Sequence, residues 1–470
     1  MPDFKKIYVN GQWIHSSGDQ YFNVVNPSDE TITAQVVMGT EDDVNLAVKA
    51  ARQAFASWRL TSADERASII GRFADELYKR RDELATLISD TMGMPKHLAF
   101  ECQVDEPIEV LRTYVSRTPI MEQSEQIGNA TVIKKPIGVC ALISPWNYPL
   151  NQLLCKVAPA LAAGCTMIIK PSEQTSLQDF VVMECAEKAG IPAGVINLVP
   201  GYGPEVGAAL SGHPDIDLIS FTGSTRAGTH IAQNAAATVK RVVQELGGKS
   251  PLIMTEDCDF DAAVEYGLDD VLINTGQTCT AYTRWLVPES KLATVEAAVH
   301  NLIDNYKIGM DEDAYIGPLV NRAQFEKVEN LIQSGIDEGA QLLTGGIGKP
   351  EGFDKGFFVK PTIFTQVNNE MTIAKEEIFG PVISIIVYRD LSQAIEIAND
   401  TPYGLSSAVF AKDTTSGFNI AKHIDAGLCY INGGDYNIEA PFGGVKQSGN
   451  GREFGDHGLQ EFYEVQAIHV

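Results

Sequence analysis

The sequence lacks any apolar run of the roughly 20 residues that a membrane-spanning helix needs, and Met1 to Asn10 contains no signal-peptide core. Basic residues are also scarce, because 36 Lys and Arg stand against 61 Asp and Glu, a net charge of −25. Such an acidic surface argues against nucleic-acid and anionic-membrane partners. We therefore expect a soluble, cytoplasmic protein that binds neither nucleic acid nor membrane.

Several catalytic and metal-binding motifs are absent as well. The eight cysteines contain no C-x-x-C pair and the eight histidines show no metal-ligand spacing, so we expect no metal and mostly reduced core thiols. No G-x-S-x-G occurs, which removes support for a serine-hydrolase elbow. Gly248-Lys249-Ser250 resembles the end of a phosphate-binding P-loop, but Val243 occupies the position of the required glycine.

The composition that remains is that of a globular protein with more than one domain. At roughly 150 residues per domain, 470 residues suggest two or three domains. The opening third is predicted to be helical, with one apolar helical face from Val44 to Trp58 and a capping-box start at Ser62 and Glu65. No low-complexity linker separates segments, so the domains should pack closely, with a cleft between them.

From Gly138 onward, short β-rich runs alternate with helical spacing, which predicts an α/β fold with a doubly wound parallel sheet. After about residue 246 the same alternation predicts a second α/β domain. The expected strands are Val139 to Ile143, Thr166 to Ile169, Val195 to Val199, Leu218 to Phe221, Arg241 to Glu245, Leu252 to Met254, Val382 to Tyr388, Ser406 to Phe410 and Leu428 to Asn432.

Two glycine-bearing turns could approach a dinucleotide. Residues 201–207 follow one expected strand, although the third glycine comes one residue late for G-x-G-x-x-G, and residues 221–228 follow the next strand and open a helix. Lys170 and Glu173 lie just beyond another strand, where they could hydrogen-bond to ribose hydroxyls. Alone, each of these features is equally compatible with an ordinary turn or a solvated loop.

Cys279 lies in a small, polar loop, Asn274 to Thr280, after an apolar helix. A reactive thiol needs exposure and hydrogen-bond donors, whereas a structural one usually has apolar neighbours. Glu245 and the segment Pro145 to Pro149 end strands at the same predicted edge of the sheet. Together they offer a nucleophile, a base and an amide donor.

With these motifs the sequence resembles the aldehyde dehydrogenase superfamily, in its hydrolytic, NAD(P)-dependent branch, from about residue 5 to the C-terminus. The motifs are Ser144-Pro145-Trp146-Asn147-Tyr148-Pro149, Lys170-Pro171-Ser172-Glu173, Phe221-Thr222-Gly223-Ser224, Glu245-Leu246-Gly247-Gly248-Lys249, Gly276-Gln277-Thr278-Cys279, Glu376-Glu377-Ile378-Phe379-Gly380-Pro381 and Pro441-Phe442-Gly443-Gly444. The resemblance implies a Rossmann-like NAD-binding domain of residues 1–117 and 137–246, a catalytic domain of residues 247–430 and a small β oligomerisation arm of residues 118–136 and 460–470.

The resemblance also implies roles. Cys279 is the expected nucleophile, Asn147 and the Cys279 N–H form the oxyanion hole, Glu245 is the general base and Lys156 has a supporting role. The cofactor is expected to be NAD rather than NADP, because Glu173 should repel a 2′-phosphate. The expected cofactor contacts are Ser144, Pro145, Trp146, Lys170, Ser172, Glu173, Gly203, Phe221, Gly223, Ser224, Leu246, Glu377 and Phe379.

The substrate is expected to be a small-molecule aldehyde. By position its pocket would be lined by Tyr148, Gln152, Cys155, Thr278, Thr280 and Tyr436, with no arginine to clamp a carboxylate. The alternation of Tyr463, Val465, Ala467 and His469 predicts a strand that either adds to a partner's sheet, giving a homodimer or homotetramer, or remains a surface edge.

Two other functions fit parts of this pattern. A CoA-acylating aldehyde dehydrogenase shares the fold but has less use for a water-activating base such as Glu245. A non-catalytic binding or structural protein of the same fold would not need Cys279, Asn147 and Glu245 together.

Overall fold

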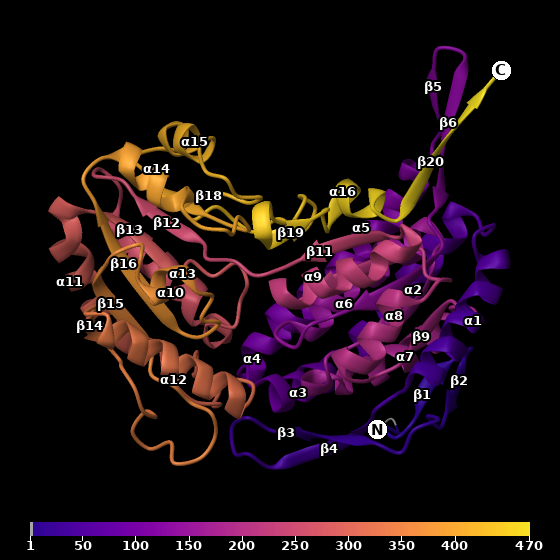
Figure 1. Cartoon of the computed structure of the whole chain (residues 1–470), viewed down its shortest axis with the longest axis horizontal. Helices are drawn as coiled ribbons and strands as arrows, with labels where there is room; N and C mark the ends of the chain where they lie inside the picture. The colour runs from indigo at the N-terminus through magenta and orange to yellow at the C-terminus, as the bar shows by residue number, and fades with distance from the viewer. Residues whose placement is uncertain (1–2) are drawn as a thin grey trace.

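The computed structural model describes residues 3–470. Figure 1 shows two lobes side by side, each built around one sheet, with a narrow arm projecting where the C-terminus lies. The first lobe holds an eight-stranded sheet and the second a seven-stranded sheet, so the predicted α/β fold with two sheets is confirmed.

The first sheet has the strand order β19-β11-β10-β7-β8-β9-β1-β2. Its strands β7 to β11 run parallel, whereas β1, β2 and β19 join antiparallel at the edges. The order changes direction at β7, which is the arrangement of a doubly wound sheet. The strands are β1 Ile7–Val9, β2 Gln12–Ile14, β7 Val139–Ile143, β8 Thr166–Lys170, β9 Ile196–Leu198, β10 Leu218–Thr222, β11 Arg241–Glu245 and β19 Gly449–Asn450.

Alternating side chains of these buried strands enter two separate cores. Val139, Ala141 and Ile143 of β7 pack with α1, α8 and α9, while Cys140 and Leu142 pack with the helices of the opposite face. The helices of the first face are α1 Glu41–Trp58, α8 Ala208–Gly212 and α9 Thr225–Ala235, and those of the second are α2 Ala63–Lys79, α3 Arg81–Met92, α5 Glu106–Met121, α6 Pro149–Ala163 and α7 Leu177–Ala189. The parallel strands are therefore covered on both faces.

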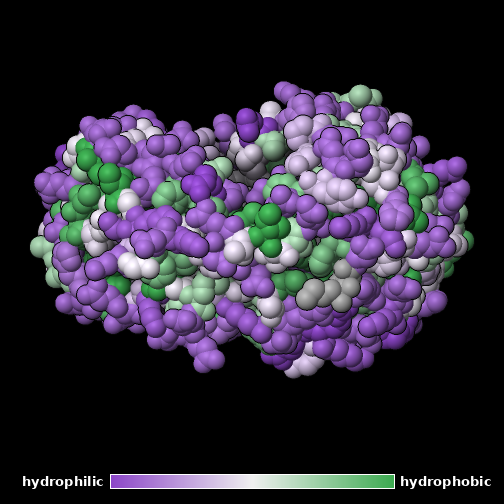
Figure 2. All heavy atoms as spheres, turned by 90° about the horizontal axis from the view of Figure 1, so that it is seen from below, coloured by the Kyte–Doolittle hydropathy of each residue, from purple (hydrophilic) through white to green (hydrophobic). Residues whose placement is uncertain are grey.

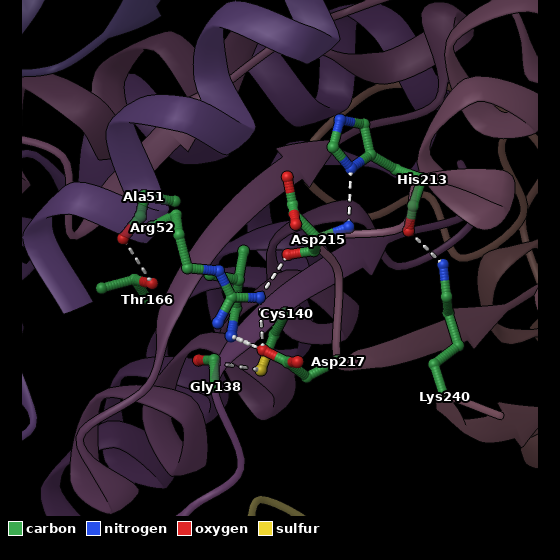
Figure 3. Close-up of polar contacts among 10 residues, drawn as sticks. Ala51, Arg52, Gly138, Cys140, Thr166, His213, Asp215, Asp217 and Lys240 are labelled. Atoms are coloured by element: carbon green, nitrogen blue, oxygen red, sulfur yellow. Dashed lines mark hydrogen bonds and ion pairs between the residues drawn. The ribbon is translucent and has the colours of Figure 1, made fainter. Parts of the chain in front are cut away.

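A polar cluster fastens α1 to the amino ends of the strands (Figure 3). Arg52 of α1 pairs with Asp217, just before β10, at 2.7 Å, and the same Asp217 oxygen accepts the Val139 N–H of β7 at 2.7 Å. Thr166 of β8 donates to the Ala51 carbonyl at 3.0 Å. Gly138 leaves room for Asp217, because a Cβ there would lie 1.8 Å from its carboxylate oxygen. This network holds the edge opposite to the one that carries the motifs.

The second sheet has the order β14-β15-β16-β13-β12-β17-β18, in which only β14 is antiparallel to its neighbour. Its strands are β12 Pro251–Met254, β13 Arg284–Pro288, β14 Gln341–Thr344, β15 Thr362–Val367, β16 Val382–Tyr388, β17 Ala408–Phe410 and β18 Tyr430–Ile431. Helices α10 Phe260–Leu272 and α11 Leu292–Leu302 pack on one face, and α12 Arg322–Asp337, α13 Thr372–Lys375, α14 Leu391–Asn399 and α15 Thr414–Ala421 on the other.

The arm is a three-stranded antiparallel sheet of β5 Glu125–Ile127, β6 Ala130–Pro136 and β20 Tyr463–His469 (Figure 1). The strand predicted over Tyr463 to His469 is confirmed, and within the chain it pairs with β6. Val465 is 67% exposed and Ile468 43%, so this edge strand presents apolar side chains to the surroundings.

The expectation that the opening third is helical is wrong for residues 7–37. They form β1, β2 and the hairpin of β3 Tyr21–Val25 and β4 Ile32–Val37. These strands are three to six residues long, and β1 gains its place by pairing with β9, a contact remote in sequence. Strands β13, β14 and β15 were also not predicted from the sequence.

Helix α2 starts as predicted with Ser62 accepting from the Glu65 N–H, without the reciprocal bond of a capping box. The complete box is at α1, between Thr40 and Asp43.

The face of the molecule in Figure 2 is mostly hydrophilic, with small scattered hydrophobic patches. Across residues 3–470, no helix combines the length and apolar character required to cross a bilayer. Over the same range, no group of three or more His, Cys, Asp or Glu side chains is arranged to hold a metal ion.

Candidate active site

The motif residues gather at the carboxyl edge of the first sheet. β7 leads into Ser144 to Tyr148, β10 into Gly223 and Ser224, and β11 ends at Glu245, so the predicted shared edge is confirmed. Segments of the second lobe close over this edge around a cavity of about 190 Å³. Its lining includes Trp146, Asn147, Gln152, Ser224, Cys279 and Glu377.

The loop before Cys279 has an unusual backbone. Asn274, Thr275 and Gly276 follow one another with φ of 52°, 57° and 71°. Left-handed backbone costs about 1–2 kcal/mol at a residue other than glycine, so surrounding contacts must hold the loop. Gly276 cannot be replaced without a shift, because a Cβ there would lie 2.1 Å from the Gly380 carbonyl oxygen.

Buried hydrogen bonds supply this support. The Thr275 hydroxyl donates to the Gly317 carbonyl at 2.9 Å, and the Gln277 amide donates to the Asn274 carbonyl at 3.0 Å. The Gln277 side-chain oxygen accepts the Val320 N–H at 2.8 Å. The loop thus presents Cys279 at a fixed place in the cavity, partly exposed.

Asn147 is tied to the same loop. Its side-chain amide donates to the Gln277 carbonyl at 2.9 Å, and its own carbonyl accepts from Asn274 and Gln103, each at 2.9 Å. A primary amide has two N–H groups, so one bond fixes the side chain and leaves the second N–H for the cavity it lines. The structure therefore brings the expected nucleophile and amide donor together.

Glu245 is 2% exposed and, among the described residues, neither of its carboxylate oxygens has a hydrogen-bond partner. Burial raises the pKa of the Glu245 carboxyl well above its usual range, and the nearby Glu453 carboxylate raises it further. Burial also raises the pKa of the Cys279 thiol, with added contributions from Glu377 and Glu245. The raised pKa makes the Glu245 carboxylate, when it is ionised, a stronger base than an exposed glutamate.

Lys156, also expected here, belongs to a buried ion pair that the sequence reasoning missed. Its ammonium contacts the Glu453 carboxylate and donates to the Thr222 hydroxyl at 2.6 Å. The second Glu453 oxygen accepts from the Cys155 thiol at 3.1 Å. Among residues 3–470, no hydrogen bond joins the Lys156 side chain to Asn147. Glu453 follows Pro441-Phe442-Gly443-Gly444 by several residues and carried no motif of its own.

Glu377 and Phe379 approach the cavity from the second lobe. A Glu377 oxygen accepts the Gly248 N–H at 3.0 Å, and Lys327 donates to the Glu377 carbonyl at 2.8 Å. The Phe379 ring meets Trp146 edge-on at 5.3 Å between centroids. Burial raises the pKa of the Glu377 carboxyl, opposed by the Gly248 N–H.

The remaining expected cofactor residues divide into two groups. Pro145, Trp146, Gly223, Ser224, Leu246, Glu377 and Phe379 line the cavity. Ser144, Lys170, Ser172, Glu173, Gly203 and Phe221 do not line it and lie along the same sheet edge, at or just after the strands. Ser224 is the N-cap of α9, where its side chain accepts the Ala227 N–H at 3.3 Å, so α9 directs its amino end toward this edge.

Lys170 is buried at the end of β8 and donates to the Pro171 carbonyl at 2.7 Å. Burial lowers the pKa of its ammonium, an effect that Glu173 and Asp179 oppose. Ser172 caps the turn Glu173–Thr175. The Lys170 and Glu173 pair thus stands close together at the edge of the sheet, as expected.

The expected substrate-pocket residues are only partly together. Gln152 lines the cavity with Cys279, and the Tyr148 hydroxyl lies 2.9 Å from that of Thr278. Tyr436 lines a separate recess of about 340 Å³ with Tyr430 and Phe442. Cys155 is buried and its thiol donates to Glu453, and neither Cys155 nor Thr280 lines either space.

Comparison with known proteins identifies the family of this site. The aldehyde dehydrogenase family model matches residues 13–468. The chain is 45% identical to a 3-succinoylsemialdehyde-pyridine dehydrogenase from Pseudomonas sp, over 100% of this chain and 99% of that protein. It is 42% identical to a putative aldehyde dehydrogenase of Staphylococcus aureus, with the same coverage.

Solved structures agree. A cysteine-to-alanine mutant of aldehyde dehydrogenase C from Pseudomonas syringae, in complex with NAD+ and octanal, superposes with a TM-score of 0.98 at 45% identity, covering 100% of this chain and 98% of that one. Betaine aldehyde dehydrogenase from Staphylococcus aureus, in complex with NAD+, gives 0.95 at 36% identity, covering 99% and 94%. The chain belongs to the aldehyde dehydrogenase family and is an oxidoreductase of that class.

Proposed function

We propose that this protein oxidises an aldehyde to the carboxylic acid with NAD, through a thiohemiacetal and then a thioester on Cys279, with water activated by Glu245. The observation that carries the proposal is the arrangement of the thiol. Cys279 sits at the end of a strained, hydrogen-bonded loop, in one cavity with Asn147, while Glu245 is close enough to raise the pKa of the thiol. Strain held at a defined position is typical of functional sites.

In the first step the Cys279 sulfur bonds to the aldehyde carbon after the thiol proton passes to Glu245. The free Asn147 N–H and the Cys279 backbone N–H stabilise the oxyanion that forms. The carbonyl then reforms as the carbon loses a hydride, leaving the acyl group on sulfur. Glu245 then gives the first proton to solvent. Water attacks the thioester while Glu245 takes a water proton, the C–S bond breaks, the Cys279 sulfur regains a proton, and the carboxylate product leaves.

NAD, when bound, supplies the acceptor for the hydride. The residues present fit such a group, since Ser224 sets the amino end of α9 at the cavity, where backbone N–H groups favour phosphate. Lys170 and Glu173 would hold the ribose hydroxyls, and Glu377 would hold the nicotinamide side. The full set we assign is Ser144, Pro145, Trp146, Lys170, Ser172, Glu173, Gly203, Phe221, Gly223, Ser224, Leu246, Glu377 and Phe379. The Glu173 carboxylate favours NAD over NADP by repelling a 2′-phosphate.

The relatives support a small aldehyde but differ in what the aldehyde carries. The Pseudomonas syringae structure holds octanal, while the other names specify betaine aldehyde and a pyridine semialdehyde. These tails are apolar, quaternary and heteroaromatic. The class of aldehyde that this protein oxidises must therefore be inferred from its own residues.

We assign residues 1–117 and 137–246 to an NAD-binding domain, residues 247–430 to a catalytic domain, and residues 118–136 and 460–470 to an oligomerisation arm. The exposed apolar side chains of β20 on its unshared edge support a homodimer or homotetramer. The acidic composition supports a cytoplasmic enzyme without nucleic-acid or membrane partners.

Two assays separate this proposal from its rivals. Wild-type protein with NAD and an aldehyde panel should form NADH and carboxylic acid, without stimulation by CoA. An obligatory need for CoA with acyl-CoA as product would indicate the acylating branch, and no NADH from any aldehyde would indicate a binding protein.

A further inference from the structure

Gln103 is a buried amide to which the proposed chemistry gives no role. It lies in the π-helical segment Ala99–Asp105 that precedes α5, and its side chain is fully buried. Its side-chain N–H donates to the Asn147 carbonyl at 2.9 Å, and among residues 3–470 its side-chain oxygen has no hydrogen-bond partner. Burying an amide costs free energy unless hydrogen bonds offset the loss of water. The one bond that this amide makes is therefore directed at the expected oxyanion donor.

The π-helical segment is a well-packed support for Gln103. Hydrogen bonds from i to i+5 widen its helical turn, and irregular turns of this kind recur at functional sites. The segment packs against α3 and against α6, the helix that begins two residues after Asn147. Val104, the neighbour of Gln103, enters the core that these helices share. Gln103 thus reaches the Asn147 carbonyl from a fixed part of the first lobe.

The Asn147 carbonyl depends on side chains for its hydrogen bonds. Among the described residues no backbone N–H donates to this carbonyl. Gln103 of the first lobe and Asn274 of the second each donate a side-chain N–H to it at 2.9 Å. The Asn147 side chain in turn donates to the Gln277 carbonyl of the second lobe at 2.9 Å. Of these three bonds, only the one from Gln103 ties Asn147 to its own lobe, while the other two follow the loop of Cys279.

The place of the Asn147 amide decides how well it can stabilise an oxyanion. Such a donor acts at about 2.7–3.1 Å from the oxygen that gains the charge. A misplacement of about 1 Å can cost about 10²-fold in rate, even when its cause lies away from the reacting atoms. Asn147 lines the cavity of Cys279 between the two lobes, so contacts from both lobes set the position of its amide.

We propose that Gln103 is a positioning residue that sets the Asn147 amide for the oxyanion formed on Cys279. The inference rests on the proposed aldehyde oxidation and adds a residue to its machinery. Gln103 does not line the cavity, so it acts through Asn147. With the bonds from Gln103 and Asn274 both in place, the peptide after Asn147 keeps one orientation and the second side-chain N–H stays directed into the cavity.

The test removes the Gln103 N–H in two ways. Gln103→Met is an apolar side chain of similar length, and Gln103→Asn keeps an amide that is one methylene shorter. Thr166→Val is the matched control, because it also exchanges a buried donor to a backbone carbonyl for an apolar isostere, at the opposite edge of the sheet (Figure 3). Rapid mixing with saturating NAD and the aldehyde that wild type oxidises fastest gives the rate constant of the first NADH turnover. Steady-state assays give KM.

Both Gln103 variants should lower this rate constant about 10- to 100-fold and change KM by less than about twofold. Thr166→Val should stay within about twofold of wild type. Asn147→Ala should lose about 10²–10³-fold, the usual loss for one oxyanion donor. Adding Gln103→Met to Asn147→Ala should then change the rate constant by less than about twofold, because the amide that Gln103 positions is already gone.

Three results would overturn the inference and leave aldehyde oxidation standing. The first is a wild-type rate constant in the folded Gln103 variants. The second is a double variant that loses the full Gln103→Met factor beyond Asn147→Ala, since Gln103 would then act independently of Asn147. The third is loss of folding in both Gln103 variants, which would give this amide a structural role. If wild type forms no NADH from any aldehyde, the proposed function itself fails.

Discussion

Replacing Glu245 by glutamine separates the two halves of the proposed reaction. The amide keeps the size of the carboxylate but cannot take a proton, so thioester hydrolysis should slow by about 10²–10⁴-fold, the usual worth of a general base. Hydride loss precedes that step. Rapid mixing with NAD and aldehyde should therefore show a burst of NADH near one per site, followed by little turnover. If Glu245 also receives the Cys279 proton, the burst itself slows and recovers partly at high pH, because the thiolate then forms unaided.

The same substitution should stabilise the folded protein at alkaline pH. Burial and Glu453 raise the pKa of Glu245 in the folded state, so between the unfolded and the folded pKa the folded protein holds a proton that the unfolded chain has released. Stability is then lost as the pH rises from the unfolded pKa through the folded one. Both carboxylate oxygens lack partners among the described residues, and a buried unpartnered polar group costs about 1–3 kcal/mol. Glutamine stays neutral, so its gain in melting temperature over wild type should be larger at pH 8 than at pH 5.

Glu464→Gln is the matched control, because Glu464 is 56% exposed and forms only a surface pair with Arg241. It should change neither the burst nor the pH dependence of melting, since exposed pairs contribute about 0–1 kcal/mol. Steady turnover of Glu245→Gln equal to wild type would refute the base assignment. A melting temperature that falls below wild type increasingly with pH would refute the reasoning on burial.

Four further substitutions, one of them a control, test other parts of the site. Cys279→Ala should abolish NADH formation while a fluorescence titration still detects NAD binding. The control, Cys258→Ala, should keep activity. An active Cys279→Ala protein would rule out Cys279 as the nucleophile. Wild type should prefer NAD in kcat/KM and Glu173→Gln should narrow that preference, while a tenfold preference of wild type for NADP, about 1.4 kcal/mol, contradicts the ribose assignment. Glu453→Gln leaves Lys156 buried without its carboxylate, which costs about 3–5 kcal/mol, so it should melt well below Glu464→Gln. It also removes a charge that raises the pKa of Glu245, so the acidic limb of kcat against pH should move to lower pH, and an unmoved limb would contradict that coupling.

The sequence predicted those parts of the fold whose signal is local. β7 and β16 have the predicted bounds, because each is a short, mainly apolar run whose two faces are both buried. β11 also has the predicted bounds, although only Val242 and Val243 of its five residues are apolar. β1 and β2 were missed because three residues carry too little periodicity, and their stability comes from pairing with β9 far along the chain. β13 was missed because it begins with Arg284, a residue type that is usually exposed. Arg284 is fully buried here, and its guanidinium donates to the carbonyls of Lys249, Ile397 and Ala398.

The candidate site likewise contains residues that local motifs predict and residues that only tertiary contacts bring there. Cys279, Asn147 and Glu245 each end or follow a strand or an apolar helix, so local motifs mark them. The parallel order of the strands brings Asn147 and Glu245 to one edge, and a loop of the second lobe brings Cys279 to the cavity there. Glu453 reaches Lys156 only because β19 returns to pair with β11 and Phe442 pairs with Glu453, two contacts that no local pattern encodes. The burial that raises the pKa of Glu245 comes from tertiary packing, and the sequence alone does not show which carboxylates are removed from water.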